Sequence, residues 1–404
     1  MRMLRKRHLR AASAVAIASL LAGIATASDG DGVATKFEVF HDRNDVTAIS
    51  PIVELRKTIA RSLSLLWEAQ VDAVTGASRD WGRRGSGQED IDGISGASNR
   101  LDGVSGASGS EDGEQIPEIR GGTRLGLEWA RNGRVFGASL YGSTEKDYKS
   151  ISPAISGAWD FADRNTTLSW AAAWFFDEMV PKGSWSDLGG GTKRVQSYTL
   201  GLTQSFTPLT LGGVTVNWIR TTGYIGHPYN PINSLDSGLV GEILPERKDA
   251  LATSAQVIQG WLLGDLLGSV NTEYRYYSDS WDLRSQTLTV QVSQHLTEES
   301  VLRLQGRWYT QTGAAFAQSS RYAGNEAYMT ADIRFHRFSS WMAGAKFSST
   351  FPEAWTSGWA PRRWDLSYDH LVRDTKGDPL LYQLYPADAW YQQGTARAGL
   401  GWDL

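Results

Sequence analysis

The chain has 404 residues, and its 40 Lys and Arg against 44 Asp and Glu give a formal net charge of −4. A slightly acidic balance gives no reason to expect a nucleic-acid partner. Cysteine is absent from the sequence, which excludes disulfides, thiolate metal sites and a cysteine nucleophile. The 17 Trp, 15 Tyr and 43 Gly favour a β-barrel with aromatic girdles.

The N-terminus has the composition of a secretory signal peptide. A basic segment, 1–8, precedes an apolar run, 11–24, and the small residues Ala25-Thr26-Ala27 follow. A membrane-anchoring helix is the weaker alternative, because the run is shorter than the ~20 residues that a span requires. We therefore expect a signal peptide over 1–27 and an exported mature chain over 28–404 without a transmembrane helix.

From Thr35 onward, segments of about ten residues alternate apolar and polar side chains, as strands of transmembrane barrels do. Their polar faces are rich in long charged residues, which suits a wet lumen better than a sandwich core. The sequence therefore predicts a transmembrane antiparallel outer-membrane β-barrel of about 16 strands in the bacterial outer membrane. The clearest apolar faces are those of Leu63, Leu65, Trp67, Ala69 and Val71, of Leu302, Leu304 and Trp308, and of Met329, Ala331, Ile333 and Phe335.

The connections between these segments alternate in length. Short links such as Asn132-Gly133, Gly264-Asp265 and Ser339-Ser340 follow the even strands. Outer-membrane barrels have short periplasmic turns and long extracellular loops. With the N-terminus in the periplasm, every long connection is then extracellular. These long connections are 73–122, 180–193, 224–248, 313–326 and 351–390.

One short sequence occurs three times in and beside the long Gly-, Asp- and Ser-rich loop at 73–122. The first copy starts at Asp72, just before the loop, and the other two lie within it. The shared pattern is Asp, any small residue, Ile or Val, Ser or Thr, Gly, Ala and Ser. Gly and Ala before the last serine leave the backbone bare, so that an enzyme can bring a bulky nucleotide close. The positions that the three copies share are Asp72, Thr75, Gly76, Ala77 and Ser78; Asp92, Ser95, Gly96, Ala97 and Ser98; and Asp102, Ser105, Gly106, Ala107 and Ser108.

This pattern resembles the acceptor motif of proteins modified by the FAD-dependent FMN transferase, including membrane subunits of ion-pumping quinone and ferredoxin oxidoreductases. The resemblance implies covalent FMN, held through a phosphoester on Ser78, Ser98 and Ser108, and a periplasmic FMN transferase as partner. The usual acceptor is Thr, and this chain has Ser in each copy. Both residues offer a hydroxyl nucleophile.

Two simpler interpretations of the loop stay open. It is a solvated acidic loop, or a calcium loop built from carboxylates. The calcium ligands would be Asp90, Asp92, Asp102, Glu111, Asp112 and Glu114. Elsewhere, Glu145 and Asp147 at a hairpin tip are expected to be solvated, and interior arginines such as Arg56 and Arg334 are expected to pair with carboxylates.

A wider resemblance covers most of the mature chain. The segment 35–51, followed by Val71–Ser78, is similar to a family of bacterial outer-membrane proteins known only as a domain of unknown function. Further matching segments are 145–150, 244–247, 274–281 and 307–311. The resemblance implies a barrel that is often encoded near an FMN transferase and a thioredoxin-like protein, and it implies no established activity.

These observations predict a flavin-bearing electron carrier anchored among outer-membrane lipids. A thioredoxin-like or other redox protein is a possible electron partner. We identify no catalytic acid, base or nucleophile, which favours a carrier over a turnover enzyme. The alternative function is a passive porin or small-molecule channel with an unmodified solvated loop.

Overall fold

The computed structural model describes residues 31–42, 47–75, 118–181, 187, 189–226, 232–234, 238–318, 322–330, 332–352, 355, 360–374 and 390–403. The expected signal peptide, 1–27, lies outside this part of the chain.

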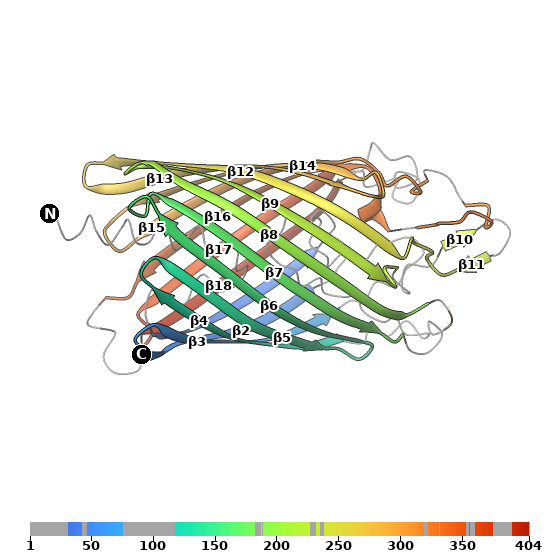
Figure 1. Ribbon diagram of the computed structural model, residues 1–404, viewed down its shortest axis with the longest axis horizontal. Helices are drawn as coiled ribbons and strands as arrows, with labels where there is room; N and C mark the ends of the chain where they lie inside the picture. The colour runs from blue at the N-terminus through green and yellow to red at the C-terminus, as the bar shows by residue number, and fades with distance from the viewer. Residues whose placement is uncertain are drawn as a thin grey trace.

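Sixteen of the described strands close into one antiparallel barrel (Figure 1), which confirms the predicted fold class. Each barrel strand pairs with the next barrel strand along the chain, and β1 pairs with β18 to complete the ring. Closure leaves no edge strand exposed. The barrel strands are β1 (Gly32–Asp42), β2 (Thr47–Ala60), β3 (Leu63–Thr75), β4 (Glu118–Arg131), β5 (Arg134–Thr144), β6 (Tyr148–Phe161), β7 (Thr166–Met179), β8 (Gly191–Thr207), β9 (Thr210–Gly223), β12 (Arg247–Leu263), β13 (Leu266–Asp279), β14 (Arg284–His295), β15 (Val301–Gln311), β16 (Phe338–Thr350), β17 (Arg363–Asp374) and β18 (Trp390–Asp403).

The outer face of the barrel is apolar. On β3, Trp67 and Val71 are exposed, whereas Asp72 on the opposite face is 2% exposed. Because side chains alternate along a strand, this places the polar face inside, as predicted. Aromatic rings gather toward both ends of the outer face, with Trp129 against Phe136 (centroids 5.7 Å apart) and Tyr198 stacked on Trp218 (5.5 Å). The exterior is therefore an apolar band flanked by aromatic girdles.

The two ends of the barrel differ in their connections. At one end, here called the turn end, the connections are mostly tight; Asn132 and Gly133, with φ of 52° and 70°, form a two-residue hairpin. Both central residues of a type I′ turn need positive φ, which Asn and Gly adopt readily. β1 starts and β18 finishes at the turn end. The opposite end, here called the loop end, carries the connection between β3 and β4.

One predicted strand is wrong and one is missed. The wrong strand is the one predicted from the alternation of Met329, Ala331, Ile333 and Phe335. This segment is part of the connection between β15 and β16, where Ile333–Phe335 forms a short 3-10 helix, η2. The missed strand is β17, so the predicted total of sixteen holds because the two errors cancel. Instead of facing lipid, Met329 is buried (2% exposed) against other loop residues, and Phe335 is buried (5% exposed) against loop residues and the inner wall.

This correction changes the connections that follow. Ser339-Ser340, predicted to be a short turn, lies inside β16 at the loop end. The predicted loop 351–390 is interrupted by β17; the connection 351–362 lies at the turn end, and 375–389 lies outside the described residues. β3 and β4 are longer than expected, so the connection between them is 76–117. Among the described residues, no helix is long and apolar enough to cross a membrane.

Candidate functional site

The structure describes only the beginning of the first motif copy. Asp72–Thr75 are the last four residues of β3. Ala73–Thr75 pair with β2 on one side, and Asp72–Val74 pair with β4 on the other. Asp72 faces the interior and accepts a hydrogen bond of 2.7 Å from Gln70 Nε2. The first copy therefore starts inside the barrel wall. The remaining motif residues, including Ser78, Ser98 and Ser108, lie outside the described residues.

Asp72 belongs to a buried polar network at the loop end. It stands opposite Arg120 on β4, which is 5% exposed. Arg120 Nη2 donates to the Tyr141 hydroxyl at 2.7 Å, and Arg120 Nε lies 3.8 Å from Glu145 Oε1. Opposite charges at this depth stabilise each other, because burial removes the water that would screen them.

Two carboxylates of the hairpin tip between β5 and β6 are buried, so the expectation that they are solvated is wrong, whereas Lys146 between them is exposed. Glu145 and Asp147 are 8% and 5% exposed. The Glu145 N–H donates to the Tyr148 carbonyl, and the Val180 N–H donates to the Asp147 carbonyl, both at 2.7 Å. The tip is therefore hydrogen-bonded within itself and to Val180, the residue that follows β7.

The network continues onto β7 and β8 through Asp177. Its carboxylate accepts from Ser150 Oγ at 2.7 Å and pairs with Lys193 Nζ at 3.2 Å. Lys193 Nζ also lies 5.8 Å from the centre of the Tyr148 ring. The segment 145–150 thus supplies several buried members of one network that reaches from Asp72 to Lys193.

Between this network and the turn end, paired charged side chains line the interior face of β15–β18 and β1–β4. Arg56 pairs with Glu128 at 2.5 Å, and Arg397 contacts both Glu38 and Asp369 at 2.5 Å. The expected pairing with a carboxylate is confirmed for Arg56, and the Arg397 pairs were not predicted. Further pairs are Lys36–Glu54 at 2.5 Å and Lys346–Asp365 at 3.0 Å.

The facing arc of the barrel has a different lining. Small hydroxyl and amide side chains occupy the middle interior positions of β5, β6, β8, β9 and β12. Asn217 Nδ2, for example, donates to Ser197 Oγ and Thr199 Oγ1 at 3.0 and 2.8 Å. The interior is therefore polar on both arcs, with charged side chains on one and neutral side chains on the other. The neutral residues include Ser139, Ser156, Ser197, Thr199, Thr215, Asn217, Ser254 and Gln256.

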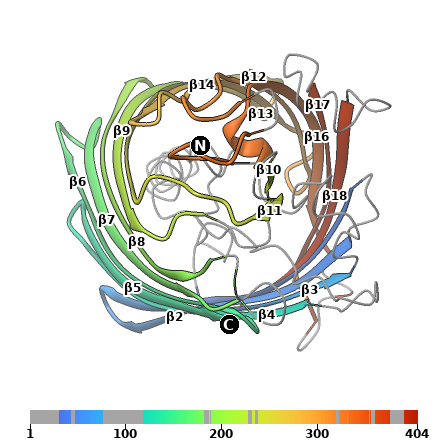
Figure 2. The same ribbon diagram turned by 90° about the vertical axis from the view of Figure 1, so that its right-hand side faces the viewer.

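Two connections cross the mouth at the loop end (Figure 2), and we call their described residues the mouth cap. They are 224–246, which contains β10 (Ile232–Ser234) and β11 (Gly238–Val240), and 312–337. Ile243 and Met329 join them through two backbone hydrogen bonds, of 2.8 and 3.0 Å. The Thr330 hydroxyl also donates to Glu242.

The mouth cap packs on the inner wall through its own small core. Trp281, in the connection between β13 and β14, contacts Phe316 and Phe335 with ring centroids 5.2 and 5.3 Å apart. Tyr277 and Ala252 complete this core from the wall, and both are buried. Apolar burial therefore fixes the cap against β12 and β13.

A buried ion pair anchors the end of the connection 312–337. Arg334 Nε donates to both carboxylate oxygens of Asp332, at 2.9 and 2.8 Å, and the Arg334 N–H donates to Oδ1 at 2.9 Å. Burial raises the pKa of Asp332 to about 6, although nearby positive charges oppose that rise. Arg334 is paired with a carboxylate, as expected, but the pair lies in the mouth cap and not in the barrel wall.

Asp332→Asn should undock the end of the mouth cap. It leaves the Arg334 guanidinium buried without its carboxylate, at a cost of about 3–5 kcal/mol. Hydrogen exchange of peptides from 312–337 should rise, while exchange of the barrel strands stays unchanged. Asp282→Asn, at an exposed position with φ of 63° that Asn tolerates, is the matched control. Unchanged exchange in Asp332→Asn would contradict the anchoring role.

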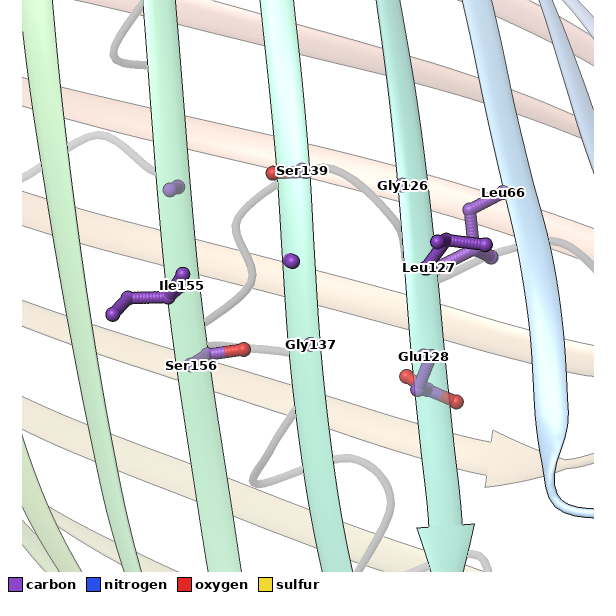
Figure 3. Close-up of a pocket in the computed structure, with 10 residues that line it drawn as sticks. Leu66, Gly126, Leu127, Glu128, Gly137, Ser139, Ile155 and Ser156 are labelled. Carbon is purple, nitrogen blue, oxygen red and sulfur yellow. The ribbon is translucent and has the colours of Figure 1, made fainter.

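A shallow recess crosses the wall at β3–β6, with about 290 Å³ of empty space that includes open solvent (Figure 3). Glu128, Ser139 and Ser156 are its polar side chains, around Gly126 and Gly137. Glu128 is already paired with Arg56, so the recess lacks a strong anchor for a ligand. In the described part of the chain, no group of His, Asp and Glu side chains could hold a metal ion. The calcium ligands considered above lie in 76–117, outside that part.

A closed antiparallel barrel with an apolar, aromatic-girdled exterior and a polar interior is the form in which bacterial outer-membrane proteins cross their membrane. The chain is of this class. It belongs to the family described as "Protein of unknown function (DUF3570)", whose model matches residues 8–362. No curated protein sequence matches it.

Solved barrels resemble it in outline. A bacterial polysaccharide outer membrane secretin has 7% identity and a TM-score of 0.48, over 93% of this chain and 99% of the other. A BenF-like porin from Pseudomonas fluorescens Pf-5 has 9% identity and a TM-score of 0.41, over 94% and 100%. OccK2 (OpdF) from Pseudomonas aeruginosa has 10% identity and a TM-score of 0.38, over 94% and 99%. Likenesses this distant say nothing about what the chain binds or transports.

Proposed function

We propose that this protein is an outer-membrane barrel that carries covalent FMN on the connection 76–117 and takes part in extracytosolic electron transfer. The observation that carries the proposal is the motif repeated three times at Ser78, Ser98 and Ser108. Both ends of the connection, Thr75 and Glu118, lie at the loop end of the barrel. Bound FMN would supply the redox chemistry, and the barrel would supply attachment and location.

The attachment is a group transfer from FAD. A bond forms between serine Oγ and the FMN phosphorus, the pyrophosphate bond of FAD breaks, and AMP leaves while the hydroxyl proton passes to solvent. A periplasmic FMN transferase is the partner that this step requires. A thioredoxin-like or other redox protein is the proposed electron partner.

Co-expression with an FMN transferase tests the proposal. The mature protein should gain the mass of one to three FMN units, less one water for each bond, and should be yellow and fluorescent. A protein that gains no mass beside a transferase proven active on another target would leave the electron-transfer function without support.

A passive channel is the second candidate, because the barrel interior is polar on both arcs. Ions and small hydrophilic solutes pass through barrels lined in this way. Purified protein in a planar bilayer should then conduct, and deletion of 76–116 should leave the conductance unchanged. Absence of conductance from protein that has folded in the bilayer would exclude this function.

Labelling of single cysteines tests which end of the barrel faces the medium. The chain has no native cysteine, so Ser110→Cys and Asp265→Cys each give one thiol. Ser110 belongs to the connection 76–117, and Asp265 is exposed in a tight turn at the turn end. An impermeant maleimide should label Ser110→Cys, and not Asp265→Cys, on intact cells. The reverse pattern would place the motif in the periplasm.

A further inference from the structure

Three arginines form a compact group on the outer face at the loop end. Arg194 on β8 and Arg247 on β12 both stand opposite Thr222 of β9, and Arg220 of β9 is two residues closer to the turn end. Neighbouring strands lie about 4.8 Å apart, so Arg194 and Arg247 are roughly 10 Å apart at the backbone. We call these three residues the arginine triangle.

The arginine triangle faces away from the barrel interior. Arg194 shares its strand face with exposed Leu200, and Arg220 shares its face with exposed Val216. The side chains of Arg220 and Arg247 are 36% and 60% exposed. The guanidinium groups are therefore available at the rim of the membrane-facing surface.

One carboxylate holds two of the arginines in place. Asp249 Oδ1 accepts from Arg220 Nε at 2.6 Å, and Asp249 Oδ2 accepts from Arg247 Nε at 2.7 Å. The three arginines and Asp249 together carry a net charge of +2, and Glu246, next to Arg247, is a further exposed carboxylate. On β6 and β7 of the same rim, by contrast, Lys149 stands opposite Glu178, so that pair is neutral.

An aromatic ladder lies directly below the arginine triangle. Arg220 Cζ is 4.8 Å from the centre of the Trp218 ring, Trp218 stacks on Tyr198 at 5.5 Å, and Trp174 meets Tyr198 edge-on at 6.1 Å. Indole and phenol rings at this position mark the level where acyl chains give way to headgroups. The arginines therefore stand at headgroup level, where a phosphate of a membrane lipid would lie.

We propose that the arginine triangle binds the phosphate groups of an anionic glycolipid in the outer leaflet. Guanidinium groups bind phosphate oxygens through charge-assisted, often paired hydrogen bonds. The aromatic ladder provides the apolar surface for the lipid's chains, which a free phosphate ion would not use. This inference rests on the membrane placement of the barrel and is independent of FMN.

Binding of diphosphoryl lipid A by the detergent-purified mature protein tests this site. Native mass spectrometry should show the glycolipid retained by the wild-type barrel. Arg194→Gln, Arg220→Gln and Arg247→Gln together should weaken binding roughly 100-fold, since each arginine near an anionic surface contributes about 1 kcal/mol. Replacement of the same three residues by lysine should restore part of the affinity.

Arg284→Gln is the matched control, because Arg284 is an exposed arginine on the loop-end rim that stands apart on β14. Its binding should equal that of the wild type, and heat-modifiable migration on gels should show that every variant is folded. Equal retention by the triple glutamine variant would overturn the proposal. So would equal retention of a dephosphorylated glycolipid, or full displacement of the lipid by millimolar inorganic phosphate, which would indicate a simple ion site.

Discussion

Ser78→Ala, Ser98→Ala and Ser108→Ala together should give a colourless protein after co-expression with an FMN transferase. Each copy of the motif offers one acceptor hydroxyl, so the three substitutions remove every attachment point. Each single substitution should remove one FMN increment from the intact mass. Absorbance in the flavin band, measured beside the mass, should fall in the same steps.

The motif contains its own control hydroxyls. Thr75, Ser95 and Ser105 precede the acceptors by three residues, and their replacement by alanine should leave the number of FMN groups unchanged as long as the transferase still recognises the motif. Peptide mapping should find flavin on the last serine of each copy. Flavin on Thr75, Ser95 or Ser105 would contradict the assignment of acceptors.

Arg120→Met should destabilise the loop end of the barrel by about 3–5 kcal/mol, the cost of breaking a buried ion pair by removing one partner. Arg120 is 5% exposed and lies against Tyr141 and Glu145, with Asp72 opposite it. The substitution leaves the Glu145 carboxylate in a buried site without this cation, and removes the positive charge that stands opposite Asp72. The unfolding midpoint in urea should fall accordingly.

A second substitution separates charge loss from packing loss. Arg120→Met with Glu145→Gln should recover part of the stability, since the double variant buries one carboxylate fewer. Arg134→Met removes an arginine that lies over the Trp159 ring at an exposed position, and should cost about 1 kcal/mol or less. Wild-type stability of Arg120→Met would show that the network contributes little.

Much of the fold was predictable because a barrel wall repeats one rule along every strand. Trp67 and Val71 face outward and Asp72 faces inward, as their alternation indicates. The same rule misled at 327–336, where Met329 and Phe335 alternate with polar residues but bury themselves in the mouth cap. Alternation of apolar and polar residues indicates that the two faces of a segment lie in different environments. It does not show whether the apolar face contacts lipid or the core of a folded loop.

The buried network could not be predicted, because it depends on pairing between distant strands. Glu145 and Asp147 occupy a hairpin tip, a position that is usually solvated. Only the register of β4 against β3 and β5 brings Arg120 beside Asp72 and Glu145. The arginine triangle is also a product of register, since Arg194, Arg220 and Arg247 are far apart in sequence and meet on three neighbouring strands.

The intact mass of the mature protein isolated from its native host tests the central claim most directly. We expect a mass above that of the unmodified chain by one, two or three FMN units, less one water for each bond. Replacement of Ser78, Ser98 or Ser108 by alanine should remove the FMN increment from the peptide that contains that residue, and this loss would assign the sites. An unmodified mass from cells that contain an active FMN transferase would contradict the account, and the passive channel would then be the better-supported function.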